Sequence, residues 1–155
     1  MGRMSLPPRL IALLVVAALS CLAYLPASAS AAPAGGSFVA KVNTARASHG
    51  LAKVKVATSL NQSSRRYAQW MLRRSYFGHV SSIRASHRFG LRGEVLARTR
   101  GADPTAAQIV RAWLDSPTHR AVLLNPRYRY VGVGLAKGRS AGRPTTLLVG
   151  HFGAR

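Results

Sequence analysis

An apolar segment near the N-terminus decides which part of the chain is available to fold. Arg3 and Arg9 precede an apolar stretch over residues 10–25, which a series of small residues follows. A basic start, a short apolar stretch and an Ala-x-Ala site are typical of a secretory signal peptide. We therefore predict that residues 1–29 or 1–31 are removed, by cleavage after Ala29 or Ala31, and that the protein is secreted.

Two alternatives to cleavage remain open. The apolar stretch could stay in place as a membrane anchor, although about 16 residues is short for a spanning helix. Cys21 could instead carry a lipid, but a lipoprotein signal has its large residue three positions before the Cys. Here Leu19 lies two positions before it. Both alternatives are weaker than a cleaved signal peptide.

Removal of residues 1–31 sets the organisation of the remaining chain. Residues 32–36 form a short leader of Pro, Gly and Ala, and residues 37–155 have a suitable length for one domain. The only cysteine of the chain leaves with the signal peptide. The domain therefore has no disulfide framework and no zinc site built from paired cysteines.

The charge of the chain is strongly positive, with 23 Lys and Arg against 3 Asp and Glu, which gives a formal net charge of +20. So few acids exclude an all-carboxylate calcium site. A solvated basic surface is the ordinary interpretation, and attraction to anionic wall polymers, acidic glycans or lipid head groups is the functional one. Secretion and the absence of a basic stripe interleaved with aromatic residues disfavour nucleic acid as a partner.

The first half of the domain carries two helix patterns. Ser37 is the expected cap of a helix that ends at Gly50, and Thr58 is the expected cap of a second helix. The second helix has an apolar stripe on one side and arginines on the other. The stripe consists of Leu60, Ser64, Tyr67, Ala68, Met71 and Leu72.

Two further helices are expected before the C-terminal third. Asp103 followed by Pro104 places a side-chain acceptor at the N-cap and a proline at the first helical position. Ser116 followed by Pro117 repeats this signal for a short helix that extends through Leu123.

The C-terminal third has a strand pattern instead. Residues 128–136 and 145–152 form an expected antiparallel hairpin joined by the loop 137–143, and residues 94–97 form an expected third strand. Helices around a small antiparallel sheet indicate a layered α+β domain.

The scarcity of acids draws attention to the three that are present. Asp103 is explained as a helix cap, and Asp115 precedes a helix start or pairs with an arginine. Glu94 is the only glutamate and has no local structural role in the sequence. It either makes a buried contact with an Arg or a His, or it serves a functional site.

Two of the five histidines are candidates for that site. His79 follows the second helix in a loop, and His119 lies in the first turn of the short helix. We expect His49 at a helix end, His87 in a loop among arginines, and His151 as an exposed or half-buried strand residue, with none of these three in the site.

Several short motifs occur along the domain in a characteristic order. They are Asn43-Thr44-Ala45-Arg46-Ala47, Tyr76-Phe77-Gly78-His79, Gly93-Glu94, Trp113-Leu114-Asp115-Ser116-Pro117-Thr118-His119-Arg120, Leu124-Asn125-Pro126 and Val131-Gly132-Val133-Gly134. These motifs resemble, in the same order, those of the CAP superfamily (cysteine-rich secretory proteins, antigen 5 and pathogenesis-related 1) in its short bacterial form, and the resemblance covers about residues 38 to 153. The resemblance implies an α-β-α sandwich around a small central antiparallel sheet.

The resemblance also implies a surface cleft with two histidines and two acids, which in some members binds a divalent metal such as zinc. His79, Glu94 and His119 match three of these positions, and Ser116 occupies the position of the second acid. Two imidazoles and one carboxylate can hold zinc and leave a position for water. Glu94 can alternatively orient a histidine from behind, and the positive charge of the surroundings weakens cation binding.

The leading hypothesis is a secreted binding protein that uses this cleft for a ligand or a component of the cell envelope. A metal-assisted hydrolase in the same cleft, with Glu94 as the base, is the alternative. The sequence favours binding over catalysis, because it contains no Ser-His-Asp or Cys-His arrangement. A second alternative is charge-driven adhesion to anionic envelope polymers through the arginine-rich faces.

Overall fold

A computed structural model describes residues 34–101 and 104–155, which form four helices and four strands. The predicted signal peptide and the first residues of the predicted leader lie outside this part of the chain. Among the described residues no helix is both long and apolar enough to cross a membrane. The elements are α1 (Ala34–Ser48), β1 (Lys55–Val56), α2 (Thr58–Arg73), β2 (Leu91–Arg100), α3 (Ala106–Asp115), α4 (Pro117–Leu123), β3 (Tyr130–Ser140) and β4 (Arg143–Ala154).

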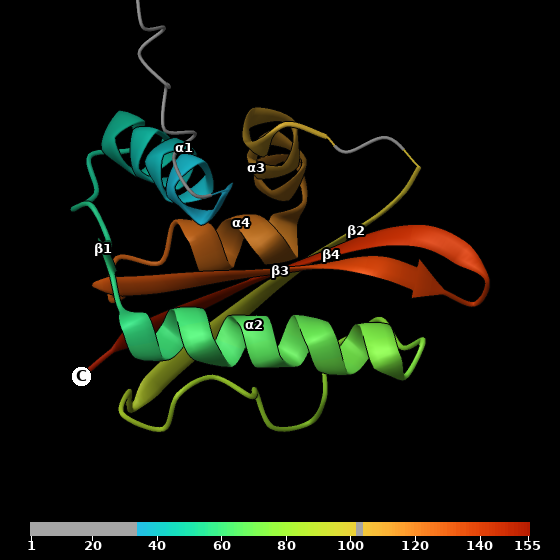
Figure 1. The fold of residues 1–155 in the computed structure, drawn as a ribbon. Helices are drawn as coiled ribbons and strands as arrows, with labels where there is room; N and C mark the ends of the chain where they lie inside the picture. The colour runs from blue at the N-terminus through green and yellow to red at the C-terminus, as the bar shows by residue number, and fades with distance from the viewer. Residues whose placement is uncertain (1–33, 102–103) are drawn as a thin grey trace, which may run out of the picture. The chain divides into compact units, whose positions relative to one another are not determined.

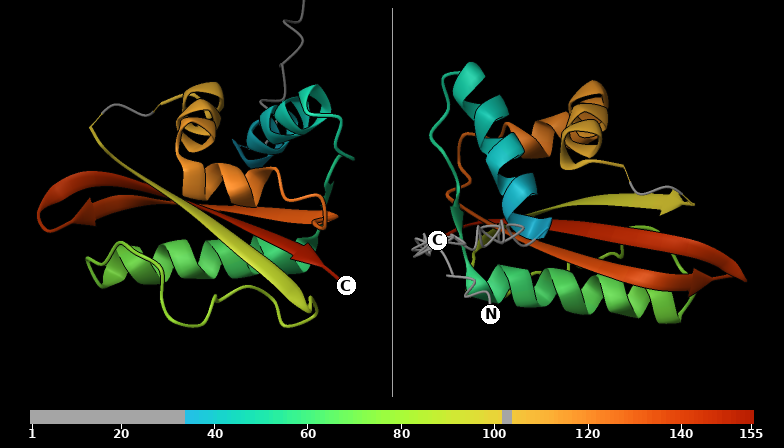
Figure 2. Two further views of the ribbon diagram at one scale, coloured as in Figure 1. Left: turned by 180° about the vertical axis from the view of Figure 1, so that it is seen from behind. Right: turned by 45° about the horizontal axis from the view of Figure 1, so that its top comes forward.

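The strands form one sheet in the order β1-β3-β4-β2, which leaves β1 and β2 at its edges. β4 pairs antiparallel with both β3 and β2, whereas the short β1 pairs parallel with β3. Helix α2 covers one face of the sheet, and α1, α3 and α4 cover the other (Figures 1 and 2). The predicted α-β-α sandwich is therefore confirmed, with one parallel strand added to its antiparallel sheet.

The alternation of side chains along the strands divides the core into two layers. Leu148 and Phe152 of β4 pack with Trp113 on the face beneath α1, α3 and α4. Leu147 and Val149 pack with the buried stripe of α2 on the other face. The predicted stripe of α2 is thus the surface that the helix buries, and residues 147, 149 and 151 share its side of the sheet.

Arg46 ties the end of α1 to the segment before β3. The helix ends in a Schellman motif, in which Gly50 has a φ of 68° and the Leu51 N–H donates to the Arg46 carbonyl. The Arg46 guanidinium is completely buried and donates to the carbonyls of Ala52, Leu123, Asn125 and Tyr128. Burial and the charge of Arg129 lower its pKa.

Three predicted helix caps are wrong. Thr58 is the first residue of α2, and its N-cap is Ala57, whose side chain makes no capping hydrogen bond. α1 begins at Ala34, so Ser37 lies inside its first turn and is not its cap. α3 begins at Ala106 with Thr105 as its N-cap, because Thr105 and Gln108 form a capping box. Asp103 lies outside the described residues.

The strands are longer than the sequence indicates. β2 extends from Leu91 to Arg100, and the hairpin of β3 and β4 continues through the residues that were predicted as its loop. The turn consists of Ala141 and Gly142 alone, with φ angles of 48° and 74°. Positive φ at both turn residues is the geometry that two-residue hairpins favour, because it matches the twist of the strands.

Candidate functional site

Glu94 is a buried carboxylate on β2, and both of its oxygens have a histidine partner. It faces α2 and lies directly opposite His151 of β4. Its side chain is 1% exposed, with Oε1 2.7 Å from His79 Nδ1 and Oε2 2.9 Å from His151 Nε2. A buried carboxylate without partners is costly, and these two contacts remove that cost. Of the two expectations for Glu94, the Glu–His contact is therefore present.

His151 corrects a prediction, because it is completely buried rather than exposed or half-buried. Its Nδ1 lies 2.9 Å from Ser63 Oγ of α2, and its ring stacks on Tyr67 at a centroid distance of 6.3 Å. The burial follows from the position of residue 151 on the side of β4 that α2 covers. This side chain belongs to the site and was missed.

The hydrogen bonds around His151 allow two arrangements of protons. The Ser63 hydroxyl donates to the Leu60 carbonyl at 3.0 Å in one arrangement, so His151 donates from both ring nitrogens and forms an imidazolium–carboxylate pair with Glu94. In the other, the hydroxyl turns to donate to Nδ1, and a neutral His151 donates only to Glu94. An ionised Glu94 accepts a hydrogen bond from His151 in both.

Tyr67 of α2 packs against the buried Glu94–His151 pair. Burial, and then the charge of Glu94, raise the pKa of Tyr67 to about 12. The phenol therefore stays protonated and donates to the Gly78 carbonyl at 2.6 Å. This bond holds the segment that carries His79 against the helix.

His79 is the exposed end of the row, with a side chain that is 54% exposed. Its Nδ1 donates to Glu94, so its Nε2 is left as the acceptor in the neutral ring. The Tyr76 hydroxyl donates to the His79 backbone carbonyl at 2.9 Å, which fixes the loop from the other side. Ser63, His151, Glu94 and His79 thus form a continuous hydrogen-bonded row from the core to the surface.

His119 and Ser116 form a second pair at the start of α4. Ser116 is the N-cap residue, and its Oγ lies 3.0 Å from His119 Nδ1. Burial, and then the positive charge of His79, lower the pKa of His119. The two candidate histidines therefore interact electrostatically even though they come from opposite faces of the sheet.

A cleft of about 410 Å³ runs along the free edge of β2, which we call the β2-edge cleft. β2 passes between α4 and α2 in the left view of Figure 2, so residues from both faces reach this edge. Trp113 Nε1 donates to the Leu96 carbonyl at 3.0 Å and satisfies one group of the unpaired edge. The cleft is lined by apolar residues such as Phe77, Leu96, Ile109 and Trp113. Its polar lining consists of Arg98, Thr99, Gln108, Ser116 and His119.

The fit of a metal to these residues is incomplete. Glu94 and His79 do not line the β2-edge cleft, the Glu94 side chain is only 1% exposed, and each of its oxygens already accepts a hydrogen bond from a histidine. His79 and His119 each keep Nε2 for a metal, because their Nδ1 atoms bond to Glu94 and Ser116. No group of three potential ligands occurs among the described residues. Their chemistry fits two imidazole ligands rather than the expected three-ligand site.

The remaining candidates lie outside this arrangement. Asp115 is exposed and lies 3.8 Å from Arg111 on the same helix, which agrees with its predicted pairing with an arginine. His49 is exposed and contacts the Ala45 carbonyl, and His87 is exposed and contacts Arg92.

Comparison with known proteins gives a consistent result for the sequence and the fold. The model of the cysteine-rich secretory protein family, CAP, matches residues 39–152. The uncharacterized protein YkwD of Bacillus subtilis is 31% identical over 107 residues, and the membrane protein YlbC of the same organism is 32% identical over 102 residues. These matches cover 63% and 60% of this chain but only 40% and 29% of the relatives, so the chain spans less than half of each.

Solved structures share the fold at lower identity. An outer surface protein from Borrelia burgdorferi superposes with a TM-score of 0.60 and 21% identity, over 76% of this chain and 89% of that protein. An extracellular protein from Bacillus anthracis that contains an SCP domain superposes with a TM-score of 0.63 and 21% identity, over 79% and 40% of the two chains.

Proposed function

The chain belongs to the cysteine-rich secretory protein (CAP) family, and on that premise we propose that it is an extracellular protein that binds a ligand or envelope component in the β2-edge cleft. Two of its structural relatives are described as an outer surface protein and an extracellular protein. The predicted signal peptide supports the same location for this chain.

The proposal rests on the lining of the β2-edge cleft, which combines apolar and polar side chains. Apolar side chains, among them Phe77, Leu96 and Trp113, line it together with the Ser116–His119 pair. Ligand sites are commonly apolar hollows in which a few polar groups fix the orientation. A ligand with an apolar body and a hydrogen-bonding group at one end is complementary to this arrangement.

The geometry favours binding over metal-assisted hydrolysis. A general base must reach the water that it activates, whereas the Glu94 side chain is 1% exposed, does not line the cleft and already accepts hydrogen bonds from His79 and His151. Glu94 is better placed to hold His79 in one tautomer. A zinc ion, if it binds, would be held by Nε2 of His79 and of His119, where it would act as a Lewis acid toward a bound group.

The proposal can be tested with Trp113 as a fluorescent reporter. The chain has two tryptophans, so a Trp70→Phe variant leaves only the one that lines the cleft. We expect a fraction of a bacterial cell-envelope extract to shift the emission of Trp113. The same titration of His119→Ala and Ser116→Ala in this background should need at least tenfold more of the fraction.

A matched control is His87→Ala, which removes an exposed histidine outside the cleft and should leave the titration unchanged. No response to any fraction, or a response that His119→Ala does not weaken, would contradict the proposal. Calorimetric titration with zinc tests the metal separately, because binding through the two imidazoles must disappear in His79→Ala/His119→Ala. A hydrolytic activity that Glu94→Gln abolishes would support the enzyme instead.

A further inference from the structure

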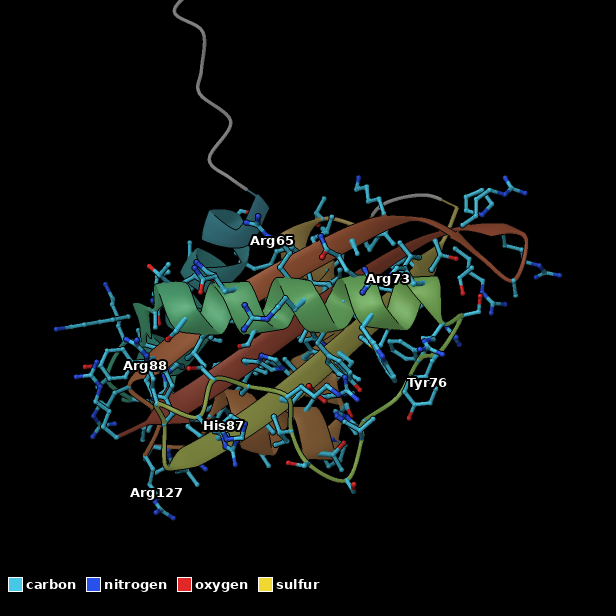
Figure 3. The ribbon with its side chains drawn as sticks, turned by 60° about the horizontal axis from the view of Figure 1, so that its bottom comes forward. Arg65, Arg73, Tyr76, His87, Arg88 and Arg127 are labelled. Atoms are coloured by element: carbon cyan, nitrogen blue, oxygen red, sulfur yellow. The ribbon has the colours of Figure 1, made fainter. Side chains whose placement is uncertain are left out.

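A second hollow, of about 700 Å³, lies where β2 begins and β4 ends. Five cationic side chains line it, and we call it the basic hollow. They are Lys53, Lys55, Arg127, Arg129 and Arg155. None of the residues that line the basic hollow also lines the β2-edge cleft. Figure 3 shows Arg127 reaching outward at the opposite end of the molecule from Tyr76, whose hydroxyl bonds to His79.

Backbone hydrogen bonds hold the three cationic segments of the basic hollow together. The Lys55 N–H donates to the Arg129 carbonyl at 2.8 Å, and the Arg129 N–H donates to the Gly153 carbonyl at 3.1 Å. The Arg155 guanidinium lies over the Tyr130 ring, 5.4 Å from its centroid. Residues that are distant in the sequence are therefore fixed around one hollow by the sheet itself.

The positive charge of the basic hollow is not compensated by the described side chains that surround it. No carboxylate side chain lines it. The two described acids are engaged elsewhere, Glu94 with two histidines and Asp115 beside Arg111. Like charges in a concave surface raise the local potential, which favours an anion with several closely spaced charges.

We propose that the basic hollow binds a chain of phosphate groups, either a soluble phosphodiester polymer or the phosphodiester head groups of an anionic lipid surface. Guanidinium groups present paired donors that match phosphate oxygens, and lysines add point charges. A chain of phosphates places several negative charges close together and so can engage more than one of the five cations that line the hollow. This binding is independent of the ligand proposed for the β2-edge cleft.

The test compares two variants that lose the same charge. Lys53→Gln/Lys55→Gln/Arg127→Gln removes three exposed side chains of the basic hollow and keeps Arg129, which donates to the Tyr128 carbonyl. The matched control, Arg65→Gln/Arg73→Gln/Arg74→Gln, removes three exposed arginines of α2 and its C-cap. The probe is sodium tripolyphosphate, measured by calorimetry in about 50 mM NaCl, where screening is weak.

We expect the hollow variant to lose at least tenfold in affinity for tripolyphosphate and the control to lose less than threefold. Equal losses would overturn the proposal, because they would mean that only the net charge matters. Citrate should bind the unmodified protein at least tenfold more weakly than tripolyphosphate. Equal binding of citrate would overturn the assignment to phosphate.

A second measurement does not depend on any variant. Tripolyphosphate should shift the amide resonances of Gly90 and Ala154, which line the basic hollow, more than those of α2. Soluble glycerol-phosphate oligomers and vesicles of phosphatidylglycerol then distinguish the two sources of phosphate. Binding of either supports the proposal, and binding of neither overturns it.

Discussion

The two histidine partners of Glu94 have different exposures, and this difference assigns them different roles. His151 is completely buried and bonds to one carboxylate oxygen of Glu94. His79 is half exposed, and its bond to the other carboxylate oxygen fixes the orientation of its ring. A carboxylate that fixes one ring nitrogen of a histidine also fixes the tautomer and the direction of the other nitrogen. His151 does not reach the surface itself, and it influences the exposed His79 only by holding Glu94 in place.

We predict that His151→Ala destabilises the protein far more than His79→Ala. Removal of the buried His151 leaves Oε2 of Glu94 buried without a partner, while Oε1 keeps the exposed His79, and costs about 3 to 5 kcal/mol. Removal of the exposed His79 leaves that buried pair in place and costs less than about 1 kcal/mol. Urea unfolding of the unmodified protein and the two variants measures both differences. Equal losses of unfolding free energy would contradict the prediction, because the exposed His79 would then contribute as much as the buried His151.

The acid sensitivity of folding should depend on His119. Burial and the charge of His79 lower the pKa of His119 in the folded protein, so the unfolded chain takes up this proton at a higher pH. Folding stability therefore falls as the pH drops below about 6.5 and stops falling below the lowered pKa. Above that window this histidine makes no pH-dependent contribution.

The measurement is the thermal unfolding midpoint between about pH 7.5 and about pH 4.5, a range that spans the ordinary pKa of histidine. His119→Gln should show a smaller decline than the unmodified protein, since only the contribution of this histidine is removed. His87→Ala, which lacks an exposed loop histidine, is the control and should decline like the unmodified protein. Parallel curves for His119→Gln and the unmodified protein would contradict the prediction.

At this scale the sequence identified Glu94 because it is the only glutamate and lacks a local role. It did not identify His151, although the alternation of Leu147, Val149 and His151 places all three on one side of a strand. Which side of β4 is covered by a helix depends on the packing of α2, a long-range contact that no local pattern contains. Ser116 was selected by position, and its bond to His119 was found only in the structure.

At the scale of elements, glycines set the distance between α2 and β3. A Cβ atom on Gly132 would lie 2.1 Å from the carbonyl carbon of Leu60, and one on Gly134 would lie 2.1 Å from the Arg65 nitrogen. The close approach lets the Ser64 hydroxyl donate to the Gly132 carbonyl at 3.0 Å. It also brings Ser63 and Tyr67 of the same helix within reach of His151.

We predict that Gly134→Ala costs about 3 kcal/mol or more, because the obstructing atoms are backbone and the helix must move. Gly138→Ala on the same strand is the control. Its Cβ would meet only the Leu72 side chain, at 3.0 Å, so its effect should stay within about 1 kcal/mol. Thermal unfolding measures both, and Gly134→Ala should also weaken any binding that depends on His79. Equal stabilities of the two variants would contradict this account of the helix–sheet contact.

The elements that the sequence predicted well are those with a complete local signal. α2 has a continuous apolar stripe, and α4 has the Ser116–Pro117 start. β1 has only two exposed residues and is held by β3, which is far along the chain. The hairpin continues through polar residues such as Lys137 because backbone pairing to β4 does not require apolar side chains.

At the scale of the whole molecule, the excess of positive charge opposes compaction. Of the three acids in the sequence, Glu94 is buried between histidines and Asp115 contacts Arg111 at 3.8 Å. Most arginines and lysines of the described residues therefore have no carboxylate partner. Salt screens such repulsion over distances of about 10 Å at 0.1 M, so the folded state should gain stability when salt is added.

We expect the thermal midpoint to rise by about 3 to 6 °C between about 10 mM and about 300 mM NaCl, which corresponds to about 1 kcal/mol for a domain of this size. The Arg65→Gln/Arg73→Gln/Arg74→Gln variant should start with a higher midpoint at the lower salt concentration and respond less to salt, because fewer cations repel one another. If tripolyphosphate occupies the basic hollow, it should raise the midpoint of the unmodified protein beyond what NaCl of equal ionic strength achieves. A midpoint that falls with salt would show that attractive ion pairs outweigh the repulsion and would remove the reason for an anionic partner.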